Sequence, residues 1–299
     1  MKNTIFTGAG VAIVTPMHQD GTVNYSEFSR LIDYNIENGT DAIIVCGTTG
    51  ESATLNYEEH CEVIKYCVDY VAGRVPVVAG TGSNDTAFAI ELSKQACKDG
   101  ADGLLVVTPY YNKTSQRGLI KHFNMIADAS EKPLILYSVA SRTGVNIEPA
   151  TCKELSKHPN IVGIKEASGN LSQVAKIRAL CGDDLHVYSG NDDQVVPIMS
   201  LGGKGVISVL SNVMPRQMHE ITNFCLKGDF KSAANISLQT LPLANALFTD
   251  VNPIPVKEAL SIMGFEVGPC RLPLCEMSEE KHNALLKVMQ DFRLVGILR

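Results

Sequence analysis

The sequence predicts an α/β protein, a (β/α)8 TIM barrel with a small C-terminal helical appendage. Short apolar runs follow one another through the first two thirds of the chain, with starts roughly 20 to 35 residues apart. Nearly every interval between them carries a helical pattern, and this alternation is typical of βαβ units with a parallel sheet. We predict eight strands, at residues 11–14, 42–46, 75–79, 103–107, 134–137, 161–165, 186–189 and 205–209.

Eight parallel strands fit a closed barrel better than an open sheet. An open sheet that binds a dinucleotide would need a Gly-x-Gly-x-x-Gly turn after its first strand. Here the first strand runs into Thr15-Pro16-Met17, and the chain also lacks a Gly-x-x-x-x-Gly-Lys-Ser/Thr phosphate loop. The sequence therefore offers no cofactor site.

The second helix illustrates the pattern between strands. Asn56 is a candidate N-cap, and Glu59, three residues later, completes a capping box. Gly73 follows the helical stripe and is expected to end the helix. The apolar stripe of this helix consists of Val63, Ile64, Cys67, Val68 and Val71.

The last quarter of the chain has a different pattern. Helical segments are expected at residues 216–227, 231–248, 255–263 and 278–294, separated by short Gly, Asn and Pro turns. We interpret the first as the last barrel helix. The expected division is therefore a catalytic barrel over residues 1–227 and a docked helical region over residues 228–299.

Composition narrows the class of protein. The 299 residues carry a formal net charge of −6 and no basic cluster, which argues against nucleic acid or an anionic membrane as a partner. No apolar run reaches the roughly 18 residues of a membrane span. Nine scattered cysteines, mostly in apolar stretches, are typical of a reduced cytoplasmic protein. Neither they nor the seven histidines have the spacing of a metal site.

One residue stands out in this pattern, because Lys165 ends an apolar strand. Alternate side chains of a strand point to opposite faces, so we expect Ile161, Gly163 and Lys165 to share one face and Glu166 to point away. A lysine in this position is more often a strand end whose amine reaches water. The alternative is an amine that loses its proton and forms a Schiff base with a carbonyl.

The neighbouring strand ends favour the alternative. Catalytic groups of barrel enzymes sit where strands end and βα loops begin. The ends here supply a hydroxyl pair between glycines, a candidate anion cradle, together with a phenol that can relay protons and an arginine that can clamp a carboxylate. Alone, each has an ordinary structural explanation; together they suit Schiff-base chemistry on a small keto acid. These groups are Thr48 and Thr49, Tyr137 and Arg142.

The motifs at these strand ends make the chain resemble the dihydrodipicolinate synthase family of the pyruvate-dependent class I aldolases. The resemblance covers essentially the whole chain, including its helical C-terminal part. The matching motifs are Gly47-Thr48-Thr49-Gly50-Glu51, Thr108-Pro109-Tyr110-Tyr111-Asn112, Tyr137 with Arg142-Thr143-Gly144, Gly163-Ile164-Lys165-Glu166 and Ser189-Gly190-Asn191-Asp192.

The resemblance implies a reaction and a set of roles. Lys165 would form an imine with pyruvate, and the derived enamine would attack aspartate semialdehyde on the diaminopimelate route to lysine. The family is usually a homotetramer, a dimer of dimers. By this resemblance, Tyr137, Thr48 and Tyr111 would form a proton relay, with Tyr111 coming from a neighbouring subunit. Thr48 and Thr49 would bind the pyruvate carboxylate, and Arg142 would bind the carboxylate of the second substrate. The backbone carbonyls of Gly190 and Ile207 would line the pocket.

Two departures from the family pattern carry further expectations. Ser138 and Ala140 stand where the family generally has asparagine and proline, and loss of the proline should loosen the loop that carries Arg142. Phe88 stands where lysine-inhibited relatives have a glutamate that meets the ligand's ammonium. We therefore predict weak or absent inhibition by lysine. The other positions matching the lysine site are Ser52, Ala53, Tyr57, His60, Asn84 and Tyr110.

Two other functions stay open at the level of sequence. An aldolase for sialic acid or 2-keto-3-deoxy sugar acids would share Lys165 and Tyr137, although such relatives generally lack Arg142. A catalytically silent barrel that binds keto acids belongs to a different class, and reduction with borohydride in the presence of pyruvate distinguishes it.

Overall fold

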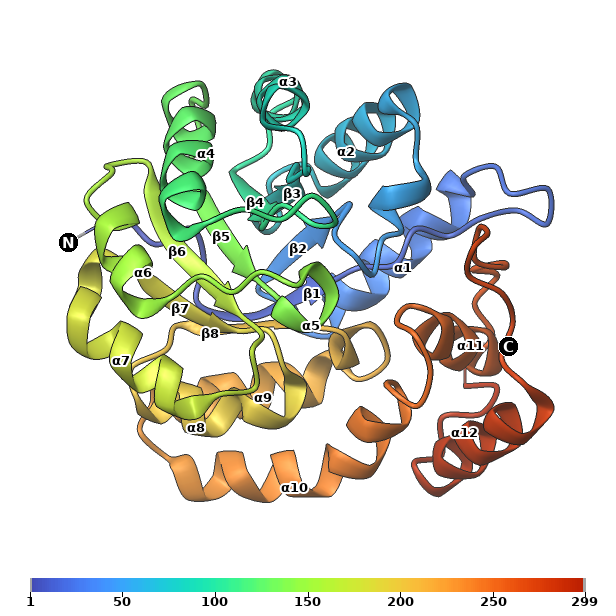
Figure 1. Ribbon diagram of the computed structural model, residues 1–299. Coiled ribbons are helices and arrows are strands. Elements are labelled where there is room, and N and C mark those ends of the chain that lie inside the picture. The colour runs from blue at the N-terminus through green and yellow to red at the C-terminus, as the bar shows by residue number, and fades with distance from the viewer. Residues whose placement is uncertain (1, 298–299) are drawn as a thin grey trace.

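The computed structural model describes residues 2–297 and contains a closed barrel of eight parallel strands, each paired with the next and the last with the first (Figure 1). The predicted fold class is confirmed. The strands are β1 (Gly8–Ala12), β2 (Ala42–Val45), β3 (Val77–Gly80), β4 (Gly103–Val107), β5 (Leu134–Ser138), β6 (Ile161–Glu166), β7 (His186–Ser189) and β8 (Gly205–Ser208).

Helices surround the barrel and connect successive strands, as Figure 1 shows. The short α5 is an addition to this alternation, because it precedes α6 in the same interval. The helices between β1 and the end of the barrel are α1 (Tyr25–Glu37), α2 (Tyr57–Val71), α3 (Thr86–Lys98), α4 (Gln116–Asp128), α5 (Ala140–Thr143), α6 (Pro149–Leu155), α7 (Leu171–Cys181), α8 (Val195–Ser200) and α9 (Pro215–Leu226).

Three further helices follow: α10 (Phe230–Ala246), α11 (Ile254–Met263) and α12 (Glu279–Asp291). α10 packs along α9, and α12 packs on α10 and α11 (Figure 1). We propose the division at residues 227 and 228 for the folded chain as well, since α9 ends at Leu226. None of the helices within residues 2–297 combines the length and apolar character that crossing a membrane requires.

The local signals on α2 lie as predicted at its start. Asn56 accepts a hydrogen bond from the Glu59 amide, and the Glu59 side chain accepts one from the Asn56 amide. The helix stops at Val71, and Ala72 and Gly73 after it are both left-handed, with φ of 49° and 73°, so Gly73 lies in the turn that ends the helix, as predicted. The capping box therefore fixes where the helix starts, and a left-handed alanine followed by a left-handed glycine ends it.

Closure of the barrel depends on glycine. A Cβ on Gly205 would lie 1.9 Å from the carbonyl oxygen of Gly8, on the strand with which it pairs. Such a contact is far below van der Waals distance, so the β1–β8 seam admits no side chain at Gly205.

The barrel interior holds its own apolar cluster, separate from the larger one between strands and helices. Ile135 and Tyr137 of β5 share the interior face, as predicted. The prediction for Ile161 was wrong, because this side chain packs in the outer cluster. The β5–β6 register shifts between Leu134 and Ile135, which rotates Ile161 away from the face of the later β6 residues.

Candidate active site

Lys165 and Tyr137 lie side by side near the carboxyl ends of β6 and β5. The parallel ladder pairs the two residues directly. Lys165 Nζ lies 4.4 Å from the centroid of the Tyr137 ring, and the residues are 6% and 7% exposed. The lysines that form ion pairs in the described part of the chain do not include Lys165. The barrel therefore presents a buried amine beside a phenol, with no carboxylate bound to it.

The floor beneath this amine is aromatic. Tyr188 of β7 pairs with Lys165 across the ladder, and its hydroxyl donates to the Phe6 carbonyl at 2.6 Å. The rings of Phe6 and Tyr188 stack with centroids 4.6 Å apart. A Cβ on Gly163 would lie 3.3 Å from the Tyr188 ring, so glycine leaves room for this ring below Lys165. Aromatic side chains therefore fill the barrel interior below Lys165.

The hydroxyl pair follows β2 in a tight turn. Thr49 is 3% exposed, and its Oγ1 accepts a hydrogen bond from Asn252 Nδ2 at 3.0 Å. A hydroxyl that accepts in this way still has its own proton to donate. A Cβ on Gly50 would lie 3.2 Å from the Cys46 amide nitrogen, so the turn is packed closely on its own strand end.

Arg142 lies on the four-residue helix α5, where the sequence predicted a loop. Its Nη2 donates to the Asn252 carbonyl at 3.3 Å. Arg142 and Thr48 line the same cavity of about 450 Å³, a volume suited to a small molecule. Lys165 and Tyr137 do not line it. Val139 connects the two places, because it lines the cavity and packs in the interior cluster with Tyr137.

Tyr111 is not brought to this site within one chain. It is 92% exposed in the loop before α4 and has φ of 67°, while its neighbour Tyr110 is 38% exposed and lines the cavity. The cavity of its own chain therefore contains Tyr110 and not Tyr111.

Gly190 directly follows β7, and Ile207 lies on β8. The Gly190 amide donates to the Glu166 carbonyl at 2.8 Å, and a Cβ there would lie 2.5 Å from Ala167 Cβ. Ile207 is fully buried in the interior cluster on β8. Glycine at position 190 thus allows the β7 end to lie against the segment after β6.

Two buried carboxyl groups flank Lys165 from different sides. Glu166 points to the helix layer, as predicted, and accepts hydrogen bonds from Gln173 Nε2 and the Ser168 amide. Asp192 Oδ2 accepts from the amide of Leu210 at 2.9 Å. Burial raises the pKa of each carboxyl; for Asp192, hydrogen bonds and the nearby charge of Lys165 oppose the rise. Asp192 is thus a buried carboxyl group near Lys165 that sequence analysis assigned no role.

Asn252 and Lys257 were also missed as site residues, and both come from the segment that begins α11. Asn252 contacts Thr49 and Arg142, and Lys257 forms an ion pair with Glu51, which follows the hydroxyl pair. Lys165 stood out in the sequence as a lysine at the end of an apolar run. Lys257 has the same signal, because it follows the apolar residues Ile254, Pro255 and Val256.

Within residues 2–297 no group of three or more His, Cys, Asp or Glu side chains could hold a metal ion. The ends of β2, β5 and β6 instead bring a buried amine, a phenol, a hydroxyl pair and a guanidinium to one end of the barrel. This set can form an imine with a carbonyl compound that also carries a carboxylate.

Comparison with known proteins gives consistent matches. Residues 5–292 match the model of the dihydrodipicolinate synthetase family. A relative from Caldicellulosiruptor saccharolyticus, 4-hydroxy-tetrahydrodipicolinate synthase, is 56% identical over 288 residues, covering 96% of this chain and 97% of the relative. The structure of dihydrodipicolinate synthase from Aquifex aeolicus superposes with a TM-score of 0.95 at 45% identity, covering 97% and 99% of the two chains. A structure described as the first monomeric dihydrodipicolinate synthase variant superposes with a TM-score of 0.95 at 42% identity, covering 97% of this chain and 98% of the other.

Proposed function

The chain belongs to the dihydrodipicolinate synthetase family, and we propose on this premise how its residues divide the work. The reaction is the condensation of pyruvate with aspartate 4-semialdehyde to 4-hydroxy-tetrahydrodipicolinate, a lyase reaction of lysine biosynthesis. The observation that carries the assignment of residues is the buried Lys165 amine at the β6 end, beside the Tyr137 ring.

Lys165 attacks the keto carbon of pyruvate, and water leaves as the imine forms. Loss of a methyl proton then gives an enamine, whose carbon attacks the aldehyde of the semialdehyde. Cyclisation releases the product and frees the lysine. The Tyr137 hydroxyl carries protons to and from these intermediates together with Thr48 and Tyr111, supported by the position of its ring beside Nζ.

Thr48 and Thr49 hold the pyruvate carboxylate. Support comes from Asn252, whose amide donates to Thr49 Oγ1 and so leaves the Thr49 proton for the substrate. Arg142 binds the carboxylate of the second substrate, supported by its position in the cavity next to Thr48. The backbone carbonyls of Gly190 and Ile207 complete the pocket.

The enzyme is proposed to be a homotetramer, a dimer of dimers, in which Tyr111 enters the site of a neighbouring subunit. The 92% exposure of Tyr111 supports this, because the phenol contacts little of its own chain. Activity should then fall on dilution in step with dissociation measured by sedimentation; full specific activity of isolated monomers would contradict a shared site. A cytoplasmic location is supported by the nine cysteines, all free.

Trapping with borohydride tests the central step. The protein is incubated with pyruvate, reduced, digested and analysed by mass spectrometry. We expect the mass of a reduced pyruvate adduct on the peptide that contains Lys165, and none when pyruvate is omitted. A protein that stays unmodified under these conditions would rule out every Schiff-base mechanism.

A further inference from the structure

Glu51 and Lys257 form a buried ion pair at the end of the proposed pyruvate-binding turn. Lys257 Nζ lies 2.8 Å from Glu51 Oε1, and the two side chains are 3% and 1% exposed. A buried ion pair is often no more stabilising than apolar residues of similar volume, so its presence calls for another explanation. We propose that Glu51 and Lys257 are positioning residues, which hold Thr48 and Thr49 in the geometry that binds the pyruvate carboxylate.

Glu51 belongs to the same turn as the two threonines. Its amide donates to the Thr48 carbonyl at 3.1 Å, and its backbone is left-handed, with φ of 55°. Residues with a side chain rarely adopt this conformation unless their surroundings hold them in it. Whatever fixes the Glu51 side chain therefore also fixes the end of the turn.

Lys257 holds the turn by two routes. Its ammonium contacts the Glu51 carboxylate directly, and it donates to the carbonyl of Thr15 at 3.5 Å and to that of Pro269 at 2.7 Å. The Thr15 hydroxyl in turn donates to the Gly50 carbonyl at 2.7 Å. One ammonium thus connects the β1 end, the turn after β2 and the segment after α11.

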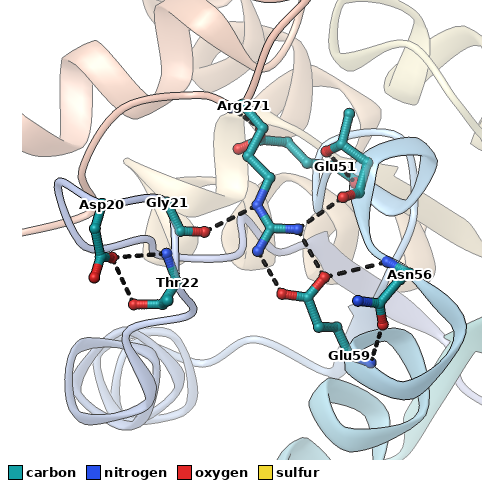
Figure 2. Close-up of polar contacts among 8 residues, drawn as sticks. Asp20, Gly21, Thr22, Glu51, Asn56, Glu59 and Arg271 are labelled. Atoms are coloured by element: carbon teal, nitrogen blue, oxygen red, sulfur yellow. Dashed lines mark hydrogen bonds and ion pairs between the residues drawn. The ribbon is translucent and has the colours of Figure 1, made fainter.

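The second oxygen of Glu51 is also occupied. The Arg271 amide donates to Glu51 Oε2 at 2.8 Å. Figure 2 shows the Arg271 guanidinium between the Gly21 carbonyl and the Glu59 carboxylate. It donates to the Gly21 carbonyl at 2.9 Å and to the two carboxylate oxygens of Glu59 at 2.6 and 2.8 Å. The segment that supplies this amide is therefore anchored on α2 and on the loop before α1.

The charge of Glu51 gives the pair a second effect on binding. A carboxylate two residues after Thr49 opposes an anion held by that turn unless a cation neutralises it. Lys257 supplies this cation at 2.8 Å. Loss of Lys257 alone should therefore weaken pyruvate binding through both position and charge, whereas loss of both charges leaves only the loss of position.

Three variants separate these effects: Glu51→Gln, Lys257→Met and the two combined. For each, the thermal midpoint, kcat, the KM of both substrates and the yield of trapped Lys165 at limiting pyruvate are measured.

The double variant should fold, because it contains no unpaired buried charge. We expect its pyruvate KM to rise about tenfold, equal to about 1.4 kcal/mol, with an unchanged semialdehyde KM. Its trapping yield should recover at saturating pyruvate, and Lys257→Met should have the larger KM increase.

Glu27→Gln is the matched control. Glu27 is also buried, at 8% exposed, and its Oε1 accepts from the Glu266 amide of the C-terminal region at 2.8 Å, without contact to the turn. This variant should lower the thermal midpoint and leave the pyruvate KM unchanged.

The inference rests on the proposed roles of Thr48 and Thr49, and the experiment distinguishes the two failures. Absence of trapping in the unaltered protein overturns the proposed function. Trapping in the unaltered protein, with an unchanged pyruvate KM in the double variant, overturns only the positioning role. If Glu27→Gln raises the pyruvate KM equally, or if the double variant does not fold, the ion pair serves general stability. Either result also overturns the positioning role.

Discussion

The two halves of the barrel mouth differ in how firmly the chain holds their proposed binding groups. Lys165 and Tyr137 are buried on adjacent strands, in register with each other. Arg142 is an exposed residue on the four-residue α5, with a 3.3 Å hydrogen bond to the Asn252 carbonyl. Strand pairing and burial thus hold Lys165 and Tyr137, whereas Arg142 is exposed and a single side-chain hydrogen bond to Asn252 holds it.

Replacement of Lys165 by alanine should have the largest effect. Turnover should fall on the order of 10⁴-fold or more, the scale on which loss of a catalytic nucleophile is felt. Because the strand ladder uses backbone groups, the thermal midpoint should change far less than activity. Steady-state rates and trapping measure the loss, and Lys65→Ala, at a surface lysine 59% exposed, serves as the control. Residual trapping in Lys165→Ala would mean that another amine forms the imine.

Arg142→Ala should weaken only the use of the second substrate, aspartate semialdehyde. A hydrogen-bonded charge pair contributes roughly 1.5–3 kcal/mol, so kcat/KM for the semialdehyde should fall about 10- to 100-fold. The yield of the trapped pyruvate adduct should stay unchanged. Arg142→Lys should recover part of the loss, because it keeps the charge without the bidentate geometry. A matching rise in the pyruvate KM would show that the halves are not independent.

Ala140→Pro should hold the segment that carries Arg142 more firmly and so reduce the difference between the two halves. Ala140 is the first residue of α5, where proline is tolerated, and Val139 before it has a non-helical ψ of 69°. We expect a stability gain of about 0.4–1 kcal/mol from denaturant titration and a lower semialdehyde KM. Ala140→Gly should change both quantities in the opposite direction. Equal KM values for the two variants would indicate that the flexibility of this loop does not limit binding.

The smallest effect is expected from lysine. Phe88 lines the cavity at 38% exposed, with its ring centroid 6.1 Å from that of Tyr57, and it offers no charge to an ammonium. Sub-millimolar lysine should leave the rate unchanged, and Phe88→Glu should make it more sensitive. Full loss of activity at such concentrations would show that the phenyl ring does not prevent binding.

The sequence predicted the strands best where polar or glycine residues bound the apolar run. β4 and β7 start and end where predicted, whereas β1 begins at Gly8, three residues before the prediction. The start of β1 was missed because Gly8 and Gly10 belong to the strand, and its end was misplaced because the apolar run continues past Ala12. The facing of Ile161 depended on a register shift between two strands, and strand periodicity contains no information about such a shift.

The candidate site was predictable where one residue is unusual in its own segment. Lys165 stands out because an amine ends an apolar strand, and neighbouring strand ends then supply Tyr137 and the threonines. Asn252 and Lys257 contact the site from about 200 residues away along the chain. Their role depends on how the helices after the barrel dock, which local patterns do not specify.

The contacts at the start of α11 bear on how barrels of this kind can exchange parts. Asn252 and Lys257 reach into the mouth from the helical region, while Thr49, Glu51 and Arg142 meet them from the barrel. A transplanted barrel lacking this segment would retain its strands and Lys165 but lose the residues that contact Thr49, Glu51 and Arg142. The unit that recombination or design can move intact is therefore longer than the eightfold repeat, and it extends at least through Arg271.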